Sequence, residues 1–98
     1  EFPGGKIEES ETPKGALSRE LLEEVGIQTL QAQALTNIEF TYPDKKVSLH
    51  VFLVSNFSGQ AYGAEGQESK WATFDELHSL DFPDANAAII KVLSARHD

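Results

Sequence analysis

The sequence of 98 residues contains no cysteine and no methionine. Without cysteine the chain can form no disulfide scaffold, no cysteine nucleophile and no thiolate zinc site. Metal ligands would have to come from carboxylates, carbonyls and three histidines, and such oxygen-rich sets favour magnesium, manganese or calcium. Because the chain opens on Glu1 rather than on methionine, we expect about 30 further residues upstream in the natural protein.

Basic residues and long apolar runs are also scarce. The chain has eight Lys and Arg residues and sixteen Asp and Glu residues, which gives a net charge of -8. This charge disfavours non-specific binding to nucleic acid or anionic lipid. The longest strictly apolar runs, 51–54 and 87–90, are far shorter than the roughly 20 residues of a membrane span, and no signal peptide is recognisable. We therefore expect neither a nucleic-acid polymer nor a membrane as partner, and the cytoplasm is the default location.

What is present is the composition of an ordinary globular protein, with 40% hydrophobic and 24% charged residues. A chain of this length forms one domain at most. We expect a single domain over residues 1–98.

The stretch between Thr12 and Gly26 predicts a helix over 13–25. Thr12 suits the N-cap, Pro13 suits the first helical position, and Gly26 suits the left-handed position after the last turn. At about 100° per residue, one edge of this helix is acidic and the adjoining stripe is apolar. The acidic residues are Glu20, Glu23 and Glu24, and the apolar ones are Leu17, Leu21 and Val25.

Apolar and polar residues alternate on both sides of the turn-forming stretch 42–45, which predicts a hairpin over 36–54. The polar, glycine-containing stretch 58–69 is a predicted surface loop of a length that often carries function. Residues 70–72 are expected to return briefly to the sheet, with Trp71 in the core or in a pocket wall.

Two more helices are predicted after this loop. Thr73 and Glu76 have the spacing of a capping box for a short helix. Asp84 can cap a final helix near 84–95. The three histidines are scattered along the chain, and we assign them no chemistry.

The three glutamates of the predicted helix edge repel each other by about 0.2 to 0.5 kcal/mol per pair. One interpretation is a solvated acidic face that Lys14 and Arg19 partly neutralise. The other is a site for a hard cation such as magnesium, which takes oxygen ligands and commonly bridges carboxylates to phosphates. The spacing alone favours the first and does not exclude the second.

A wider pattern adds information. Residues 5–27 combine Gly5, Glu11 and the run from Arg19 to Ile27 at set spacings. They match every specified position of the Nudix box, so the chain resembles the Nudix hydrolases. A closer likeness to the MutT branch, whose members remove oxidised guanine nucleotides, rests on residues 1–8, 42–44 and 65–67, on Trp71, and on 81–83 with Ala85 and Asn86.

This resemblance implies an α/β Nudix fold. In the family a mixed β-sheet is flanked by the Nudix-box helix and a C-terminal helix, here at 13–25 and near 84–95. The family's opening strands are absent from this chain.

The resemblance also implies a Mg²⁺ site, with Mn²⁺ as an alternative. The family's positions for metal ligands correspond to the carbonyl of Gly4 and to Glu20, Glu23, Glu24 and Glu65. Glu20 is the expected base, and a role for Glu65 in deprotonation stays open. The structural positions of the box are Gly5, Glu11, Arg19 and Gly26, with Arg19 expected to pair with Glu11 or a neighbouring glutamate.

Substrate contacts are implied at other positions. Phe2 and Pro3 would wall the purine pocket, and the Asn86 amide would read the guanine edge, although an asparagine in a first helical turn is more often a local cap. Tyr42 and Lys45 fit the branch inexactly, since lysine lacks the bidentate fork of arginine. The expected set of substrate-binding residues is Glu1, Phe2, Pro3, Gly4, Tyr42, Lys45 and Asn86.

The implied activity is Mg²⁺-dependent hydrolysis of 8-oxo-dGTP by a monomer, through attack of water on the β phosphorus. The nucleoside triphosphate is then the partner, and the products are 8-oxo-dGMP and pyrophosphate. One alternative is a Nudix hydrolase for another nucleoside diphosphate derivative or an ordinary dNTP. A second is a non-catalytic nucleotide-binding module, which would normally lack a box glutamate, whereas all are present here.

Overall fold

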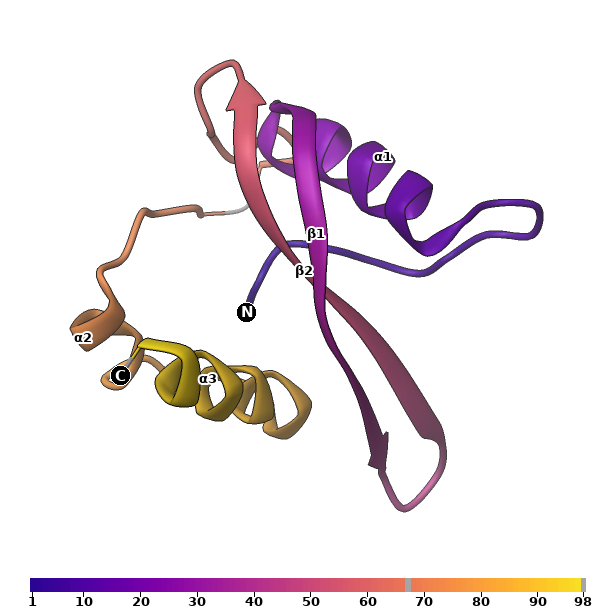
Figure 1. Cartoon of the computed structure of the whole chain (residues 1–98), viewed down its shortest axis with the longest axis vertical. Helices are drawn as coiled ribbons and strands as arrows, with labels where there is room; N and C mark the ends of the chain where they lie inside the picture. The colour runs from indigo at the N-terminus through magenta and orange to yellow at the C-terminus, as the bar shows by residue number, and fades with distance from the viewer. Residues whose placement is uncertain (67, 98) are drawn as a thin grey trace. The chain divides into compact units, whose positions relative to one another are not determined.

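The computed structural model describes residues 1–66 and 68–97. Helices and strands follow one another along the chain in the order α1 (Pro13–Val25), β1 (Gln28–Thr41), β2 (Lys46–Ser58), α2 (Phe74–Leu77) and α3 (Asp84–His97) (Figure 1). This confirms the predicted α/β class. In the described part of the chain the sheet consists of two strands, β1 and β2, and no helix there is long and apolar enough to cross a membrane.

Helix α1 begins and ends as the sequence predicts. The Oγ1 atom of Thr12 accepts a hydrogen bond from the Gly15 N–H at 3.0 Å, which caps the first turn. At the other end Gly26 has a φ of 71°, and its N–H donates to the Leu22 carbonyl at 3.2 Å. Ala16 and Leu21 are the buried residues of the helix.

The hairpin is longer than predicted. Its turn is confirmed, since the N–H of Tyr42 donates to the carbonyl of Lys45 at 2.8 Å and the reverse bond measures 3.4 Å. However, β1 begins at Gln28 and β2 continues to Ser58. The alanine- and glutamine-rich start of β1 has weak intrinsic strand preference, and pairing with the apolar second half of β2 extends it.

The expectation for residues 70–72 is wrong, because the structure assigns them to no strand. Trp71 is 71% exposed rather than part of the core. Its ring stacks on Phe57, with centroids 5.9 Å apart and planes inclined by 20°. One aromatic contact replaces the sheet pairing that the sequence suggested.

The predicted helices after the loop are confirmed. Thr73 and Glu76 form a reciprocal capping box at the start of α2, with bonds of 3.0 and 3.2 Å. Helix α3 begins at Asp84, and its buried residues Ala85 and Ile89 lie one turn apart.

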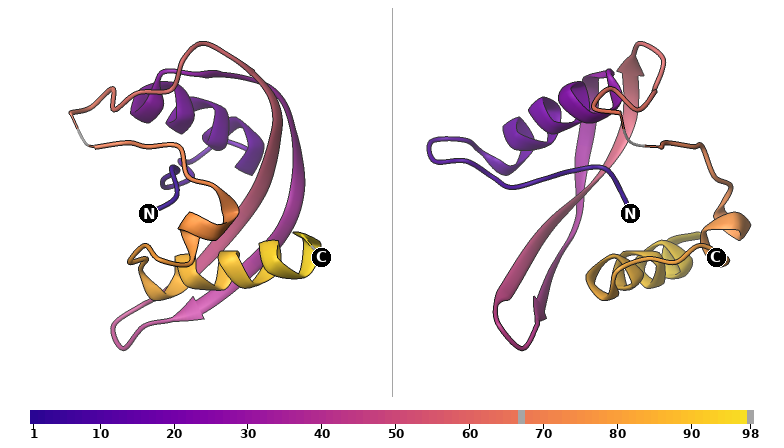
Figure 2. Two further views of the ribbon diagram at one scale, coloured as in Figure 1. Left: turned by 90° about the vertical axis from the view of Figure 1, so that its left-hand side faces the viewer. Right: turned by 180° about the vertical axis from the view of Figure 1, so that it is seen from behind.

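The contacts divide the chain into two compact units. The α1 unit comprises Phe2–Gln33 and Phe52–Trp71, and the α3 unit comprises Glu1, Ala34–Val51 and Ala72–Asp98. Each unit therefore contains one half of the hairpin. Within the α1 unit, α1 lies beside the end of the hairpin where β1 begins and β2 ends (Figure 2).

The end of α1 provides a stability test. We expect Gly26→Ala to destabilise the protein by about 2 kcal/mol, since a side chain at positive φ is strained and the added Cβ would lie 3.0 Å from Cδ1 of Tyr62. Urea unfolding measures the loss. Gly66→Ala is the matched control, because Gly66 also has positive φ but open space around its Cβ position. If Tyr62 matters, the excess loss at Gly26 disappears in a Tyr62→Ala background, and an unchanged excess would contradict this explanation.

Candidate functional site

Arg19 is the centre of a charged network in the α1 unit. Its Nε donates to Oε2 of Glu11 at 2.7 Å, and its Nη2 donates to Oε1 of the same carboxylate at 2.9 Å. This two-point geometry is the strongest form of an arginine–carboxylate pair. The Nη2 atom also donates to the carbonyl of Lys6 at 3.0 Å. The loop before α1 is thereby bound to the helix, and the expected pairing of Arg19 with Glu11 is confirmed.

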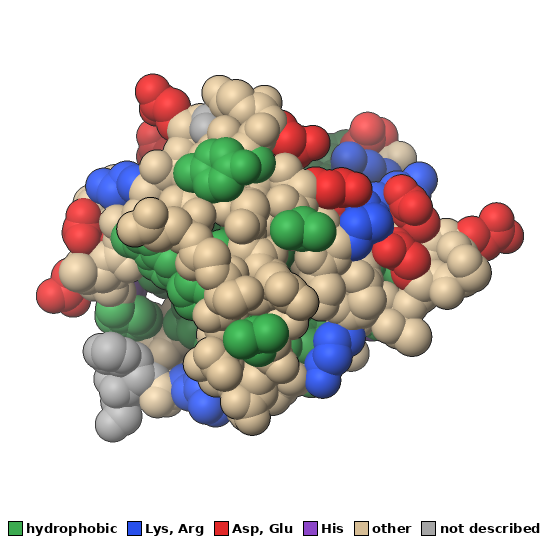
Figure 3. Space-filling view, turned by 90° about the horizontal axis from the view of Figure 1, so that it is seen from above, with side chains coloured by type: hydrophobic (Ala, Val, Ile, Leu, Met, Phe, Trp, Pro, Cys, Tyr) green, Lys and Arg blue, Asp and Glu red, His purple; other side chains and the backbone are tan. Residues whose placement is uncertain are grey.

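The remaining terminal nitrogen of Arg19 contacts the acidic edge of α1. Nη1 donates to Oε1 of Glu20 at 2.8 Å and to Oε2 of Glu23 at 3.3 Å. Acidic side chains gather around basic ones on the side of the molecule where α1 and the preceding loop lie (Figure 3). Arg19 thus supplies part of the charge compensation that the glutamate spacing requires, because opposite charges within about 4 Å attract.

The double glycine before the helix lies against this edge. The N–H of Gly4 donates to Oε2 of Glu24 at 2.8 Å. A Cβ atom on Gly5 would be only 2.6 Å from either carboxylate oxygen of Glu20. A larger residue at position 5 would push the Glu20 carboxylate away from its observed place against the backbone, which gives a physical reason for glycine in the pattern.

The loop that carries Glu65 is bonded to the other end of α1. The N–H of Tyr62 donates to the Val25 carbonyl at 3.0 Å, and the N–H of Ala64 donates to the Glu24 carbonyl at 2.8 Å. These bonds satisfy carbonyls that a helix C-terminus otherwise leaves unpaired. They bring the loop bearing Glu65 to the end of the helix bearing Glu24. Tyr62 was not among the residues singled out from the sequence, because nothing in its local pattern indicates this contact.

The ion pair changes the acidity of both partners. Hydrogen bonds from Arg19, together with a backbone bond at Glu8, lower the pKa of the Glu11 carboxyl from 4.5 to about 2. The bonds to Glu11 and Glu20 raise the pKa of Arg19 further above its ordinary value. Arg19 therefore keeps its positive charge at and well above neutral pH.

The donor chemistry of this edge suits a divalent cation. The nearby side-chain donors are carboxylates, which are hard oxygen ligands, and three of them, Glu11, Glu20 and Glu23, accept hydrogen bonds from the guanidinium of Arg19. Within residues 1–66 and 68–97, however, no group of three or more His, Asp or Glu side chains is arranged to hold a metal ion. Glu20 and Glu23 are turned toward Arg19, and Glu24 toward the N–H of Gly4.

The other predicted substrate residues are divided between the units. Phe2, which is half-buried, and Pro3, which is exposed, belong to the α1 unit. The α3 unit contains the exposed Glu1 and the half-buried Asn86 in the first turn of α3. It also contains Tyr42 and Lys45.

Tyr42 and Lys45 interact at the tip of the hairpin. The Tyr42 ring packs on Phe40 with centroids 4.8 Å apart and an interplanar angle of 52°. The Nζ atom of Lys45 lies 5.9 Å from the centroid of the Tyr42 ring, within the range of a cation–π contact. The turn therefore presents an aromatic ring and a positive charge together.

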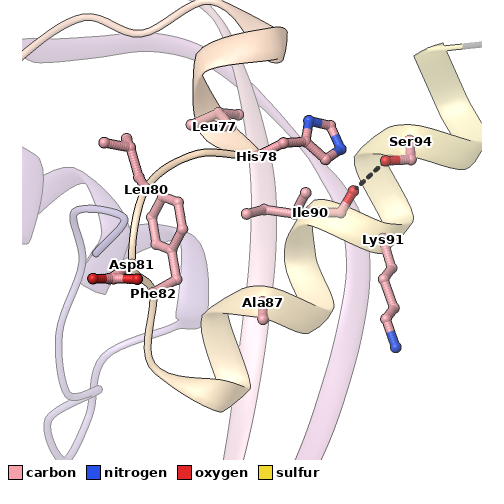
Figure 4. Close-up of a pocket in the computed structure, with 9 residues that line it drawn as sticks. All are labelled: Leu77, His78, Leu80, Asp81, Phe82, Ala87, Ile90, Lys91 and Ser94. Carbon is pink, nitrogen blue, oxygen red and sulfur yellow. Dashed lines mark hydrogen bonds between the residues drawn. The ribbon is translucent and has the colours of Figure 1, made fainter.

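The α3 unit also contains a pocket of about 410 Å³. Apolar side chains from the end of α2, the following loop and α3 point toward one another in it, and His78 lies at its edge (Figure 4). Its lining consists of Leu77, His78, Leu80, Asp81, Phe82, Ala87, Ile90, Lys91 and Ser94. None of the predicted catalytic, metal-binding or substrate-binding residues is among them.

Comparisons with known proteins agree with the sequence pattern. A model of the NUDIX domain family matches residues 1–92. The 8-oxo-dGTP diphosphatase of Haemophilus influenzae is 45% identical over 102 residues, covering all of this chain and 73% of the relative. The enzyme of the same name from Escherichia coli is 43% identical over 93 residues, covering 95% of this chain and 72% of the relative.

A solved structure gives the same result for the fold. It comes from a study of MutT from Aliivibrio salmonicida and Vibrio cholerae, and it superposes with a TM-score of 0.87 and 40% sequence identity. The match covers 96% of this chain and 77% of that one. The chain thus spans about three-quarters of the length of these relatives.

The Arg19–Glu11 pair predicts a pH effect on the metal-free protein. The side-chain carboxyl carbon of Glu11 should titrate in NMR with a midpoint of about 2. Because the pKa is lowered in the folded state, this pair stabilises the protein fully above pH 4.5, and the stabilisation is lost as the pH falls from there to about 2.

The variant Arg19→Gln should return the Glu11 midpoint toward 4.5 and remove this part of the pH dependence of unfolding. Lys14→Gln is the matched control, since it removes a positive charge from an exposed position of the same helix. An Arg19→Gln protein that is folded and still titrates near pH 2 at Glu11 would show that another group lowers the pKa.

Proposed function

We propose that this chain, which belongs to the Nudix family, hydrolyses 8-oxo-dGTP to 8-oxo-dGMP and pyrophosphate and so removes an oxidised nucleotide from the pool. The observation that carries the proposal is that hydrogen bonds hold the Nudix-box residues close together. The loop with Gly4 and Gly5, the glutamate edge of α1 and the loop with Glu65 are connected by hydrogen bonds. The named activity of two relatives above 40% identity supports the choice of substrate.

We propose Mg²⁺, with Mn²⁺ as a substitute, as the divalent cation of this site. The Gly4 carbonyl and the carboxylates of Glu20, Glu23, Glu24 and Glu65 would hold it. Their hard oxygen chemistry and the excess of carboxylates over guanidinium support this assignment. A bound divalent ion would neutralise phosphate charge and lower the pKa of a bound water.

Glu20 is the proposed base. The Glu20 carboxylate lies against the backbone at Gly5, and a carboxylate oxygen that does not bind the cation can accept the proton of the attacking water. Attack on the β phosphorus then breaks the bond to the oxygen that bridges to the α phosphorus. The nucleoside monophosphate leaves, and the water oxygen is retained in pyrophosphate. Glu65 is the second candidate for this proton transfer.

Base recognition is proposed for Asn86, whose amide offers a donor and an acceptor together. Oxidation at C8 converts N7 of guanine from a hydrogen-bond acceptor into an N–H donor. The carbonyl oxygen of an amide can accept a hydrogen bond from this N–H. Phe2 and Pro3 are proposed as walls of the base pocket. The remaining proposed substrate contacts are Glu1, Gly4, Tyr42 and Lys45.

Gly5, Glu11, Arg19 and Gly26 are proposed to maintain the box rather than to contact the substrate. Their observed contacts are with the helix, with the loop before it and with the loop that carries Tyr62, and they support this role. We also expect the protein to act as a single domain, as a monomer, and on a free nucleotide in the cytoplasm.

The first test is hydrolysis of a nucleotide panel with Mg²⁺, using 8-oxo-dGTP, dGTP, CTP and a nucleotide sugar, with pyrophosphate and phosphate measured separately. We expect 8-oxo-dGTP to give the highest kcat/KM and pyrophosphate as the product. Glu20→Gln should lower kcat by about 10² to 10⁴, the usual contribution of a general base. Glu9→Gln, at an exposed position of the preceding turn, is the matched control. Preference for the nucleotide sugar would favour the alternative Nudix activity, and binding without hydrolysis would favour the non-catalytic module.

The second test concerns Asn86. We expect Asn86→Ala to lower kcat/KM for 8-oxo-dGTP about 10- to 100-fold more than for dGTP. The reason is that the proposed hydrogen bond from N7–H to the Asn86 amide exists only with the oxidised base. Asn37→Ala, at an exposed position of β1 in the same unit, controls for the loss of an amide. Equal losses on the two nucleotides would contradict the proposed reading of the oxidised base.

A further inference from the structure

Arg19 is attached to its surroundings in two independent ways. On one side Nε and Nη2 are held by both oxygens of Glu11 and by the Lys6 carbonyl. On the other side the single atom Nη1 is shared between Glu20 and Glu23. The first set fixes the position of the guanidinium, and the second set can be lost without releasing it.

The Glu11 attachment is well satisfied in its own right. Oε1 of Glu11 also accepts the N–H of Glu8 at 2.9 Å, and the N–H of Glu11 donates to the Glu8 carbonyl at 3.1 Å. The side chain of Glu11 is 20% exposed, whereas that of Glu23 is 51% exposed. The bond from Nη1 to Glu23, at 3.3 Å, is the longest of these Arg19 hydrogen bonds, and the Glu23 side chain is more exposed than those of Glu11 and Glu20.

We propose that Arg19 is the resident counter-ion of the glutamate edge and that its Nη1 hydrogen bonds to Glu20 and Glu23 are exchanged for a divalent cation, while its bonds to Glu11 persist. This inference rests on the proposed function, because the cation belongs to the site proposed there. It adds that Arg19 competes with the cation for the same carboxylate oxygens.

The physical reason is electrostatic. A cation coordinated by Glu20 and Glu23 would stand within a few ångströms of a guanidinium that never loses its charge, and like charges at that distance repel even in a solvated setting. The same guanidinium relieves the repulsion between the glutamates while the cation is absent. Arg19 thus stabilises the metal-free edge and weakens cation binding to it.

Calorimetry with Mg²⁺ alone, without nucleotide, tests the competition. We expect Arg19→Gln to bind Mg²⁺ about 5-fold more tightly than the parent protein, from removal of one nearby positive charge. Lys14→Gln removes a positive charge from the same helix without a contact to these glutamates, and its affinity should stay within about 2-fold of the parent. Unchanged or weaker binding by a folded Arg19→Gln protein would overturn the proposal.

A second measurement needs no substitution and decides the matter if Arg19→Gln does not fold. In ¹⁵N NMR of the parent protein, saturation with Mg²⁺ should shift the Nη1 signal of Arg19 and leave its Nε signal in place. A shift of neither signal while Mg²⁺ binds and 8-oxo-dGTP is hydrolysed would overturn the exchange and leave the proposed function standing. Absence of both Mg²⁺ binding and hydrolysis would instead overturn the proposed function, and this inference with it.

Discussion

The ion pair between Arg19 and Glu11 is the interaction on which the candidate site depends. It joins two segments that are eight residues apart in sequence, and both nitrogens of one guanidinium edge are used. The pair differs from a simple charge contact in its two parallel hydrogen bonds, because a lysine could supply the charge but not these two directed donors. Since Arg19 also reaches the Lys6 carbonyl, the loop and the helix behave as one structural element.

Glu24 connects this element to the second loop of the site. Its carboxylate accepts the N–H of Gly4, while its main-chain carbonyl accepts the N–H of Ala64. One residue therefore links the glycine loop, the end of α1 and the loop that carries Glu65. Backbone hydrogen bonds thus bring the loop that carries Glu65 to the end of the helix that carries Glu24.

Features with local causes could be predicted from the sequence. Helix α1 has its cap and its terminating glycine, and the α2 capping box is written in four consecutive residues. The start of β1 could not be predicted, because it depends on pairing with β2. The position of Trp71 could not be predicted either, because its ring stacks on Phe57 of β2. Tertiary partners override weak local preference in such cases.

The same distinction applies to the candidate site. The spacing of the box residues indicated which side chains belong together, and the match of the family model over residues 1–92 agrees with it. Spacing could not show that one arginine donates hydrogen bonds to three carboxylates at once, nor that the Tyr62 ring lies against Gly26. Those facts depend on side-chain directions that only the folded chain has.

A site of this kind must satisfy two opposing demands. Its carboxylates must be close enough to bind a cation, yet they must not repel each other so strongly that the helix edge becomes unstable without one. The chain meets the first demand with rigid backbone connections at Glu24 and Glu11. It meets the second with a single arginine whose outer nitrogen is shared between Glu20 and Glu23. Because the sharing uses the most exposed of these glutamates, the charge on the edge can be rearranged by side-chain rotation alone, and the backbone that positions the site need not move.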